Sequence, residues 1–133
     1  MISLLLADDS ENMRKVIAQL LSTFPGVQLL AEAGSFCEMM DFTVALRPDV
    51  VLMDVHMSDE KTVTPMAVKA CLNGCQLVAM SLWNDEDTKS LAEAFGALTL
   101  LDKPNLANEL LPLLELCAKN VKRDAGRAQT TQK

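Results

Sequence analysis

The chain has 133 residues, half of them hydrophobic and 23% charged, which is enough for one globular domain with a substantial core. The apolar stretch ISLLLA near the N-terminus has no basic flank and is too short for a signal peptide or a membrane span, so we expect a cytoplasmic protein. Residues 119–133 hold five of the 12 basic side chains and one of the 18 acidic ones, which leaves 7 basic and 17 acidic side chains in the rest. A body this acidic is repelled by nucleic acid, which we therefore do not expect as a direct partner.

Apolar runs alternate with helical patterns five times in residues 1–118. The runs predict strands at residues 2–7, 27–33, 50–53, 76–80 and 98–101. The helical patterns predict helices at residues 11–24, between Ser35 and Pro48, at 61–72, from Asn84 or Asp85 to Gly96, and over a last segment that ends near residue 117. Residues 119–133 are polar and lack apolar periodicity, so we predict one domain over 1–118 and a basic tail or linker stub after it.

Two of these helices contain a proline. Pro65 falls early in the third helix, where a proline is tolerated only in the first turn. Pro112 lies inside the last helix, which predicts either a late start near Asn108 or a kink.

The strands are short, continuous apolar runs, as expected for strands that are buried on both faces of a parallel sheet. Right-handed crossovers between parallel strands place helices on both faces of such a sheet. The alternating pattern therefore predicts an α/β fold with a doubly wound parallel sheet.

Polar residues follow four of the five apolar runs, at the point where each run ends. They are Asp8, Asp9, Asp54, Ser81 and Lys103. In an open parallel sheet, ligands bind beyond the carboxyl ends of the strands. We therefore expect these five residues, scattered over about 95 positions, to meet in one crevice.

Three carboxylates in one crevice require a cation. Two unit charges about 4 Å apart repel by about 4 kcal/mol at an effective dielectric constant near 20. Oxygen ligands of this kind suit Mg2+, and Lys103 adds a positive charge beside them. An aspartate in such a setting can attack phosphorus to form an aspartyl-phosphate, with the metal, Lys103 and the Ser81 hydroxyl each taking one phosphoryl oxygen.

Four segments together resemble the receiver domain of two-component response regulators. They are LLLADDSENMRKVI, RPDVVLMDVHM, VAMS and FGALTLLDKP, and they span residues 1 to about 118. The resemblance implies a flavodoxin-like (βα)5 fold with strand order 2-1-3-4-5. It also implies phosphoryl transfer from a histidine of a sensor kinase, or from a phosphotransfer protein, to Asp54. The chain would then be a switch and not an enzyme that turns over an external substrate.

The resemblance also implies a metal site and a switch. Mg2+ would be bound by Asp9, Asp54 and the backbone carbonyl of His56, with Asp8 helping through water. The Ser81 hydroxyl would move toward the phosphoryl group and shift the face formed by the fourth helix and the fifth strand. That face would then bind a downstream protein target, and its apolar residues allow phosphorylation-linked dimerisation.

Several residues depart from the pattern of the family. Met57 is followed by Ser58 where the family usually has proline, and no glycine occurs from Ser58 to Pro65. The residue after the switch hydroxyl is usually small and is Leu82 here, while Leu100 occupies the place of the switch aromatic residue. Phosphorylation should survive these changes, but a relay by rotation of an aromatic ring cannot operate at Leu100.

The departures leave an alternative, a degenerate receiver that binds partners independently of phosphorylation. A phosphohydrolase of the haloacid-dehalogenase type is disfavoured, because His56 stands where that class carries its second aspartate. A flavin-binding flavodoxin is also disfavoured, because Asp8 and Asp9 would repel the flavin phosphate. For His56 and Trp83 we hypothesise that the bulky side chains partly cover the site and slow the attack of water on the aspartyl-phosphate.

Overall fold

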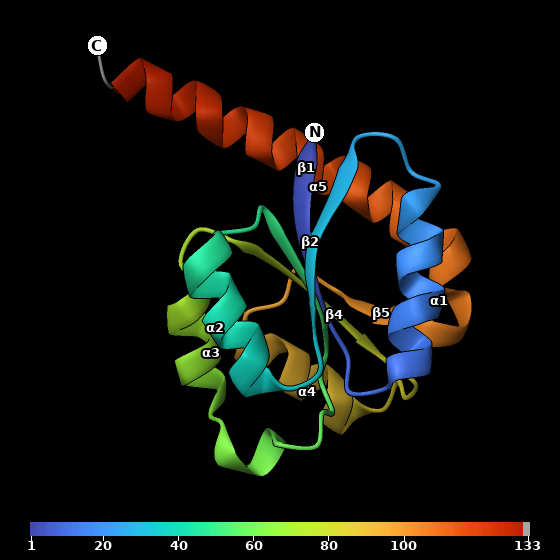
Figure 1. Cartoon of the computed structure of the whole chain (residues 1–133). Helices are drawn as coiled ribbons and strands as arrows, with labels where there is room; N and C mark the ends of the chain where they lie inside the picture. The colour runs from blue at the N-terminus through green and yellow to red at the C-terminus, as the bar shows by residue number, and fades with distance from the viewer. Residues whose placement is uncertain (132–133) are drawn as a thin grey trace.

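The computed structural model describes residues 1–131, with side chains described for residues 1–121. Its strands form one parallel sheet in the order β2-β1-β3-β4-β5 (Figure 1). The strands are β1 (Ile2–Ala7), β2 (Val27–Ala33), β3 (Val50–Asp54), β4 (Gln76–Ser81) and β5 (Leu100–Asp102). This order confirms the predicted doubly wound, flavodoxin-like (βα)5 fold.

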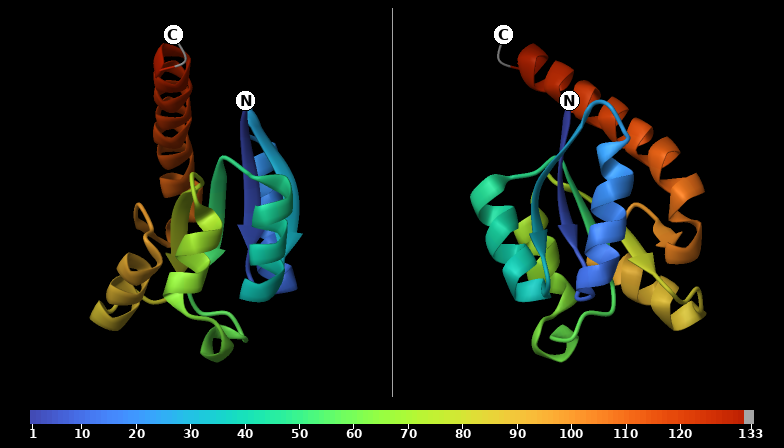
Figure 2. Two further views of the ribbon diagram at one scale, coloured as in Figure 1. Left: turned by 90° about the vertical axis from the view of Figure 1, so that its left-hand side faces the viewer. Right: turned by 45° about the vertical axis from the view of Figure 1, so that its right-hand side comes forward.

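The helices cover both faces of the sheet, as right-handed crossovers require. They are α1 (Glu11–Ser22), α2 (Phe36–Leu46), α3 (Pro65–Leu72), α4 (Glu86–Phe95) and α5 (Leu106–Thr131), with short 3-10 helices η1 (Glu60–Thr62) and η2 (Lys103–Asn105). Helices α1 and α5 lie on one face, and α2, α3 and α4 lie on the other (Figures 1 and 2).

The two cores follow from the alternation of side chains along the strands. In β1, Leu4 and Leu6 pack with Ile17 of α1 and with α5, while Leu5 packs on the other face with Phe36 of α2. These side chains are completely buried, and full burial of such a side chain contributes roughly 1.5–3 kcal/mol. The central strands are therefore anchored from both sides, which fixes the positions of their carboxyl ends.

Helix α3 begins later than the sequence pattern predicts. Thr64 caps it by accepting a hydrogen bond from the Ala67 amide at 3.1 Å, and Pro65 is its first residue. The predicted start at residue 61 is wrong because the residue before a proline avoids the helical conformation, and Thr64 is indeed extended, with ψ of 148°. Residues Glu60–Thr62 form the separate 3-10 turn η1 instead.

Helix α5 differs from the prediction at both ends. It begins at Leu106 and not near Asn108, so Pro112 lies in its second turn. It continues as helix to Thr131, past the predicted domain boundary at residue 118, and its last turns project away from the body (Figures 1 and 2). The assignment of 119–133 as a tail or linker therefore stays a prediction, but residues 119–131 are helical in their backbone.

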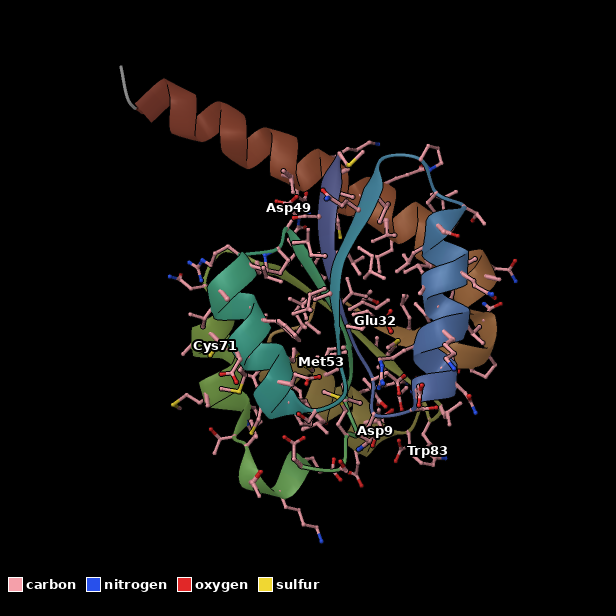
Figure 3. All side chains as sticks on the ribbon, in the orientation of Figure 1. Asp9, Glu32, Asp49, Met53, Cys71 and Trp83 are labelled. Carbon is pink, nitrogen blue, oxygen red and sulfur yellow. The ribbon has the colours of Figure 1, made fainter. Side chains whose placement is uncertain are left out.

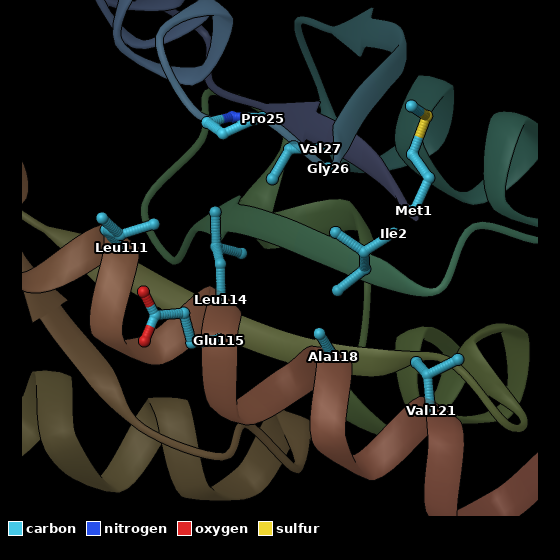
Figure 4. Close-up of a pocket in the computed structure, with 10 residues that line it drawn as sticks. All are labelled: Met1, Ile2, Pro25, Gly26, Val27, Leu111, Leu114, Glu115, Ala118 and Val121. Atoms are coloured by element: carbon cyan, nitrogen blue, oxygen red, sulfur yellow. The ribbon is translucent and has the colours of Figure 1, made fainter.

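A hollow of about 240 Å³ lies at the amino-terminal end of the sheet, far from the predicted site. Leu111, Leu114 and Val121 of α5 form one wall, and Ile2 and Val27 lie opposite them (Figure 4). Its lining is mainly apolar, so it offers little for catalytic chemistry. No helix in the described part of the chain combines the length and apolarity needed to cross a lipid bilayer.

Candidate functional site

The five predicted residues meet at the carboxyl end of the sheet. They line one cavity of about 270 Å³, to which His56, Leu82 and Trp83 also contribute. Figure 3 shows Asp9 and Trp83 together at this end of the molecule, beyond the strands. The parallel register makes this possible, because Asp54 pairs with Met80 and Ser81 pairs with Asp102, so the neighbouring strands end at the same level.

Three carboxylates form the acidic part of the site. One oxygen each from Asp8, Asp9 and Asp54 lies within 4.8 Å of the others. Asp8 is completely buried and Asp54 is 5% exposed, whereas Asp9 is open to solvent. Charges this close repel by several kcal/mol even at an effective dielectric constant near 20.

Local turns fix the two buried carboxylates. Asp8 Oδ1 accepts a hydrogen bond from the Ser10 amide at 2.9 Å, and Ser10 in turn caps α1. The Asp8 carbonyl accepts a bond from Arg14 Nη1 at 2.6 Å. On the neighbouring strand, Asp54 Oδ1 accepts from the His56 amide at 2.9 Å. Both carboxylates thus have one oxygen bound to the following loop and the other directed into the site.

Lys103 supplies the positive charge between these carboxylates. Its Nζ atom lies 2.7 Å from Asp8 Oδ2 and 3.0 Å from Asp54 Oδ2, and the residue is 8% exposed. Burial acts to lower the pKa of Lys103, but the neighbouring carboxylates of Asp8 and Asp54 outweigh it and raise the pKa above its ordinary value. Lys103 therefore remains an ammonium group at neutral pH.

Burial has the opposite effect on Asp54. It raises the pKa of the Asp54 carboxyl above its ordinary value, and Asp8 raises it further. The His56 amide and Lys103 act to lower this pKa without cancelling the effect of burial. The fold thus disfavours the charged form of Asp54, and a bound cation would favour it.

The donor set fits a divalent cation that prefers oxygen ligands. Asp8 Oδ2 is buried and lacks a hydrogen bond of good geometry, although Lys103 Nζ is its ion-pair neighbour. Carboxylate oxygens such as these three are ligands that Mg2+ takes. Lys103 neutralises only part of the negative charge, so the residues present suit the metal that the sequence implied.

Ser81 ends β4 and is 1% exposed. Its Oγ atom accepts a hydrogen bond from the Trp83 amide at 3.0 Å. Because the oxygen accepts this bond, the hydroxyl hydrogen remains free to donate to a group in the cavity. Leu82 and Trp83 follow at the rim, and their exposed fractions are 58% and 61%.

The His56 side chain is ordered by contacts that the sequence did not indicate. Its Nδ1 lies 3.1 Å from Glu60 Oε2, and its Nε2 lies 3.2 Å from Thr88 Oγ1 in α4. Its ring packs edge-on against Trp83, with ring centroids 5.7 Å apart. The side chain therefore joins the loop after β3 to α4, in addition to any role of its backbone carbonyl.

Asp59 anchors the other side of the same loop, a contact that was not predicted from the sequence. Its carboxylate accepts hydrogen bonds from the Phe36 and Cys37 amides, at 2.9 Å and 3.1 Å, at the start of α2. Slight burial acts to raise the pKa of Asp59, but these amide bonds hold it below the ordinary value. The loop is thus bound to α2 by Asp59 and to α4 by His56.

The chain from residue 4 to residue 115 matches the family model of the response regulator receiver domain. The chain therefore belongs to the receiver domains of two-component response regulators, the family that its motifs resemble. Receiver domains bind Mg2+ at an acidic pocket, and the cluster of Asp8, Asp9 and Asp54 forms such a pocket here.

The chain is similar to parts of longer proteins that differ in their names. It is 32% identical over 109 residues to protein-glutamate methylesterase/protein-glutamine glutaminase 2 of Anaeromyxobacter dehalogenans, which covers 82% of this chain and 32% of that protein. It is 31% identical over 121 residues to the transcriptional regulatory protein LiaR of Bacillus subtilis, covering 90% of this chain and 57% of LiaR. This chain thus spans less than two thirds of the length of either relative.

A solved structure supports the fold. The response regulator domain of Thermotoga maritima CheB superposes with a TM-score of 0.68 at 22% identity, over 92% of each chain. At this level of identity the likeness concerns the fold alone.

Proposed function

We propose that this chain is a phospho-acceptor switch, in which Asp54 receives a phosphoryl group from a phosphohistidine of a sensor kinase or a phosphotransfer protein. The observation that carries the proposal is the Lys103 ammonium group, buried between the carboxylates of Asp8 and Asp54 at 2.7 Å and 3.0 Å. A purely structural ion pair would not need a third carboxylate, Asp9, open to solvent beside it.

The transfer forms one bond and breaks another. An Asp54 carboxylate oxygen attacks the phosphorus, the new O–P bond forms, and the P–N bond to the donor histidine breaks, with its electron pair left on the imidazole nitrogen. Lys103 lies where it can neutralise one phosphoryl oxygen, and the free hydrogen of Ser81 can bond another. Asp9, Asp54 and the backbone carbonyl of His56, with Asp8 acting through water, would hold Mg2+, which would supply the remaining neutralisation of charge.

The product is a signal and not a released compound. The aspartyl-phosphate would persist until water hydrolyses it, and meanwhile the surface of α4 and β5 would present a changed shape to a downstream protein. We therefore propose a cytoplasmic switch with no turnover of an external substrate, whose acidic body does not bind nucleic acid directly. Phosphorylation-linked dimerisation through the same surface belongs to this proposal.

One observation favours the alternative of a phosphorylation-independent binding module. Leu82 is large and lies on the rim of the cavity, where it narrows the approach of a phosphoryl donor. A chain of this second kind would bind its partner while failing to bind Mg2+ together with beryllofluoride, a mimic of the phosphoryl group.

Labelling with acetyl phosphate or with a phosphorylated kinase separates the two functions. Wild type should gain one phosphoryl group in the presence of Mg2+, and Asp54→Asn should gain none. Asp41→Asn is the matched control, because Asp41 is an exposed aspartate of α2 that does not line the site. Labelling of Asp54→Asn equal to that of wild type, or no labelling of wild type by any donor, would contradict the proposal.

A further inference from the structure

One residue connects the phospho-acceptor with helix α4. The backbone amide of His56 donates to Asp54 Oδ1 at 2.9 Å, and its imidazole Nε2 lies 3.2 Å from Thr88 Oγ1. The two contacts come from opposite ends of the same residue. If the Asp54 carboxylate moves and displaces the His56 backbone, the contact between the imidazole and Thr88 changes as well.

Thr88 lies in the first turn of α4 and is 2% exposed. Its hydroxyl also contacts Asp85 Oδ1, and the hydrogen must point there because a carboxylate only accepts. His56 Nε2 lies 3.2 Å from the same Thr88 oxygen, so one hydroxyl makes both contacts. This donation from Thr88 lowers the pKa of Asp85 below its ordinary value.

The contact between His56 and Thr88 differs from the other contacts that hold α4 to the body, because it is polar. Among the described residues, the His56–Thr88 bond is the sole side-chain hydrogen bond that joins α4 to a residue other than Asp85, its own N-cap. The rest of the attachment is apolar packing of Leu91, Ala92 and Phe95, farther along the helix. The first turn of α4 is thus held to the site at one polar point.

We propose that the His56–Thr88 bond transmits the state of the Asp54 carboxylate to the first turn of α4. The proposal rests on the proposed function, since it needs Asp54 to change state. When Asp54 gains a phosphoryl group, the oxygen that accepts from the His56 amide changes its charge and surroundings, the His56 backbone shifts, and the imidazole moves Thr88 with it. Leu100 has no aromatic ring that could rotate, so the signal reaches α4 through the loop after β3 instead.

Hydrogen exchange of the α4 amides, measured by mass spectrometry with and without Mg2+ and beryllofluoride, tests the proposal. Thr88→Val removes the hydroxyl at nearly constant volume, and Thr88→Ser restores a hydroxyl. Ser90→Ala is the matched control, because it removes an exposed hydroxyl from the same helix. Bound beryllofluoride is followed separately by fluorine NMR, so occupancy of the site does not depend on α4.

We expect beryllofluoride to change exchange in α4 of wild type, of Ser90→Ala and of Thr88→Ser. In Thr88→Val the fold-change in the exchange rate of the α4 amides should be about five times smaller than in wild type, while beryllofluoride still binds. This factor corresponds to the net contribution of one ordinary hydrogen bond, about 1 kcal/mol. A full response of α4 in Thr88→Val overturns the proposal and leaves the switch function intact, as does a wild type that binds beryllofluoride without any response in α4. A failure of Thr88→Ser to recover the response also overturns it. A wild type that does not bind beryllofluoride overturns the proposed function itself.

Discussion

Replacement of Lys103 by methionine tests whether the site depends on balanced charge. The substitution removes the ammonium group and keeps an unbranched side chain one atom shorter. With Nζ at 2.7 Å and 3.0 Å from oxygens of Asp8 and Asp54, each attraction is about 6 kcal/mol at an effective dielectric constant near 20. The cost of removing these charges from water offsets much of that sum. Loss of one partner from a buried ion pair typically destabilises by about 3–5 kcal/mol, which is the effect we expect for Lys103→Met without metal.

The assay is urea unfolding at pH 7 in EDTA, followed by circular dichroism. Lys61→Met, at an exposed lysine of η1, serves as control and should change the free energy of unfolding by less than about 0.5 kcal/mol. Adding Asp54→Asn to Lys103→Met should recover part of the loss, because one of the two uncompensated buried carboxylates is then neutral. A loss below about 1 kcal/mol, the range of exposed ion pairs, or no recovery in the double variant would refute the reasoning.

Three further predictions follow from the site and its loop. The pKa of Asp54 is raised, so protonation of Asp54 stabilises the folded chain below the ordinary value of 3.8, and this stabilisation is lost as pH rises through the raised value. Asp54→Asn removes the charge, so this variant should melt at a higher temperature than wild type at pH 7 in EDTA. Asp59→Ala should lower the free energy of unfolding by about 1–2 kcal/mol at pH 7; because the pKa of Asp59 is lowered, the difference from wild type should shrink as pH falls below 3.8, which acid-dependent melting measures. The double variant His56→Ala, Trp83→Ala should lose its phosphoryl group faster than wild type, because both rings line the cavity; an unchanged half-life would count against a shielding role.

The strands and the polar residues at their carboxyl ends could be predicted from the sequence, because each can be recognised within a single short segment. Each central strand is a continuous apolar run because both of its faces are buried, and the first polar residue after it marks the carboxyl edge of the sheet. Asp8, Asp54 and Ser81 could therefore be placed at a common edge, and the structure brings them together around one cavity. Lys103 was predictable for the same reason, although β5 is only three residues long.

The contacts of the loop after β3 could not be predicted in this way. Asp59 bonds to the Phe36 amide, 23 residues earlier, and His56 bonds to Thr88, 32 residues later. Such pairs have no period along the chain and depend on how the loop turns. In α5 the error had a local cause, since a proline in the second turn leaves one carbonyl without its partner but does not prevent the helix from starting at Leu106.

The two anchors of this loop have a consequence for how the protein responds to its surroundings. The family usually has a proline in this segment, and its ring restricts the backbone through covalent geometry, which is indifferent to the solvent. Here polar side-chain contacts of Asp59 and His56 hold the segment in place. Contacts of charged groups such as the Asp59 carboxylate weaken with added salt. The lifetime of the phosphorylated state should therefore vary with ionic strength in this chain more than in relatives whose loop is stiffened by its backbone.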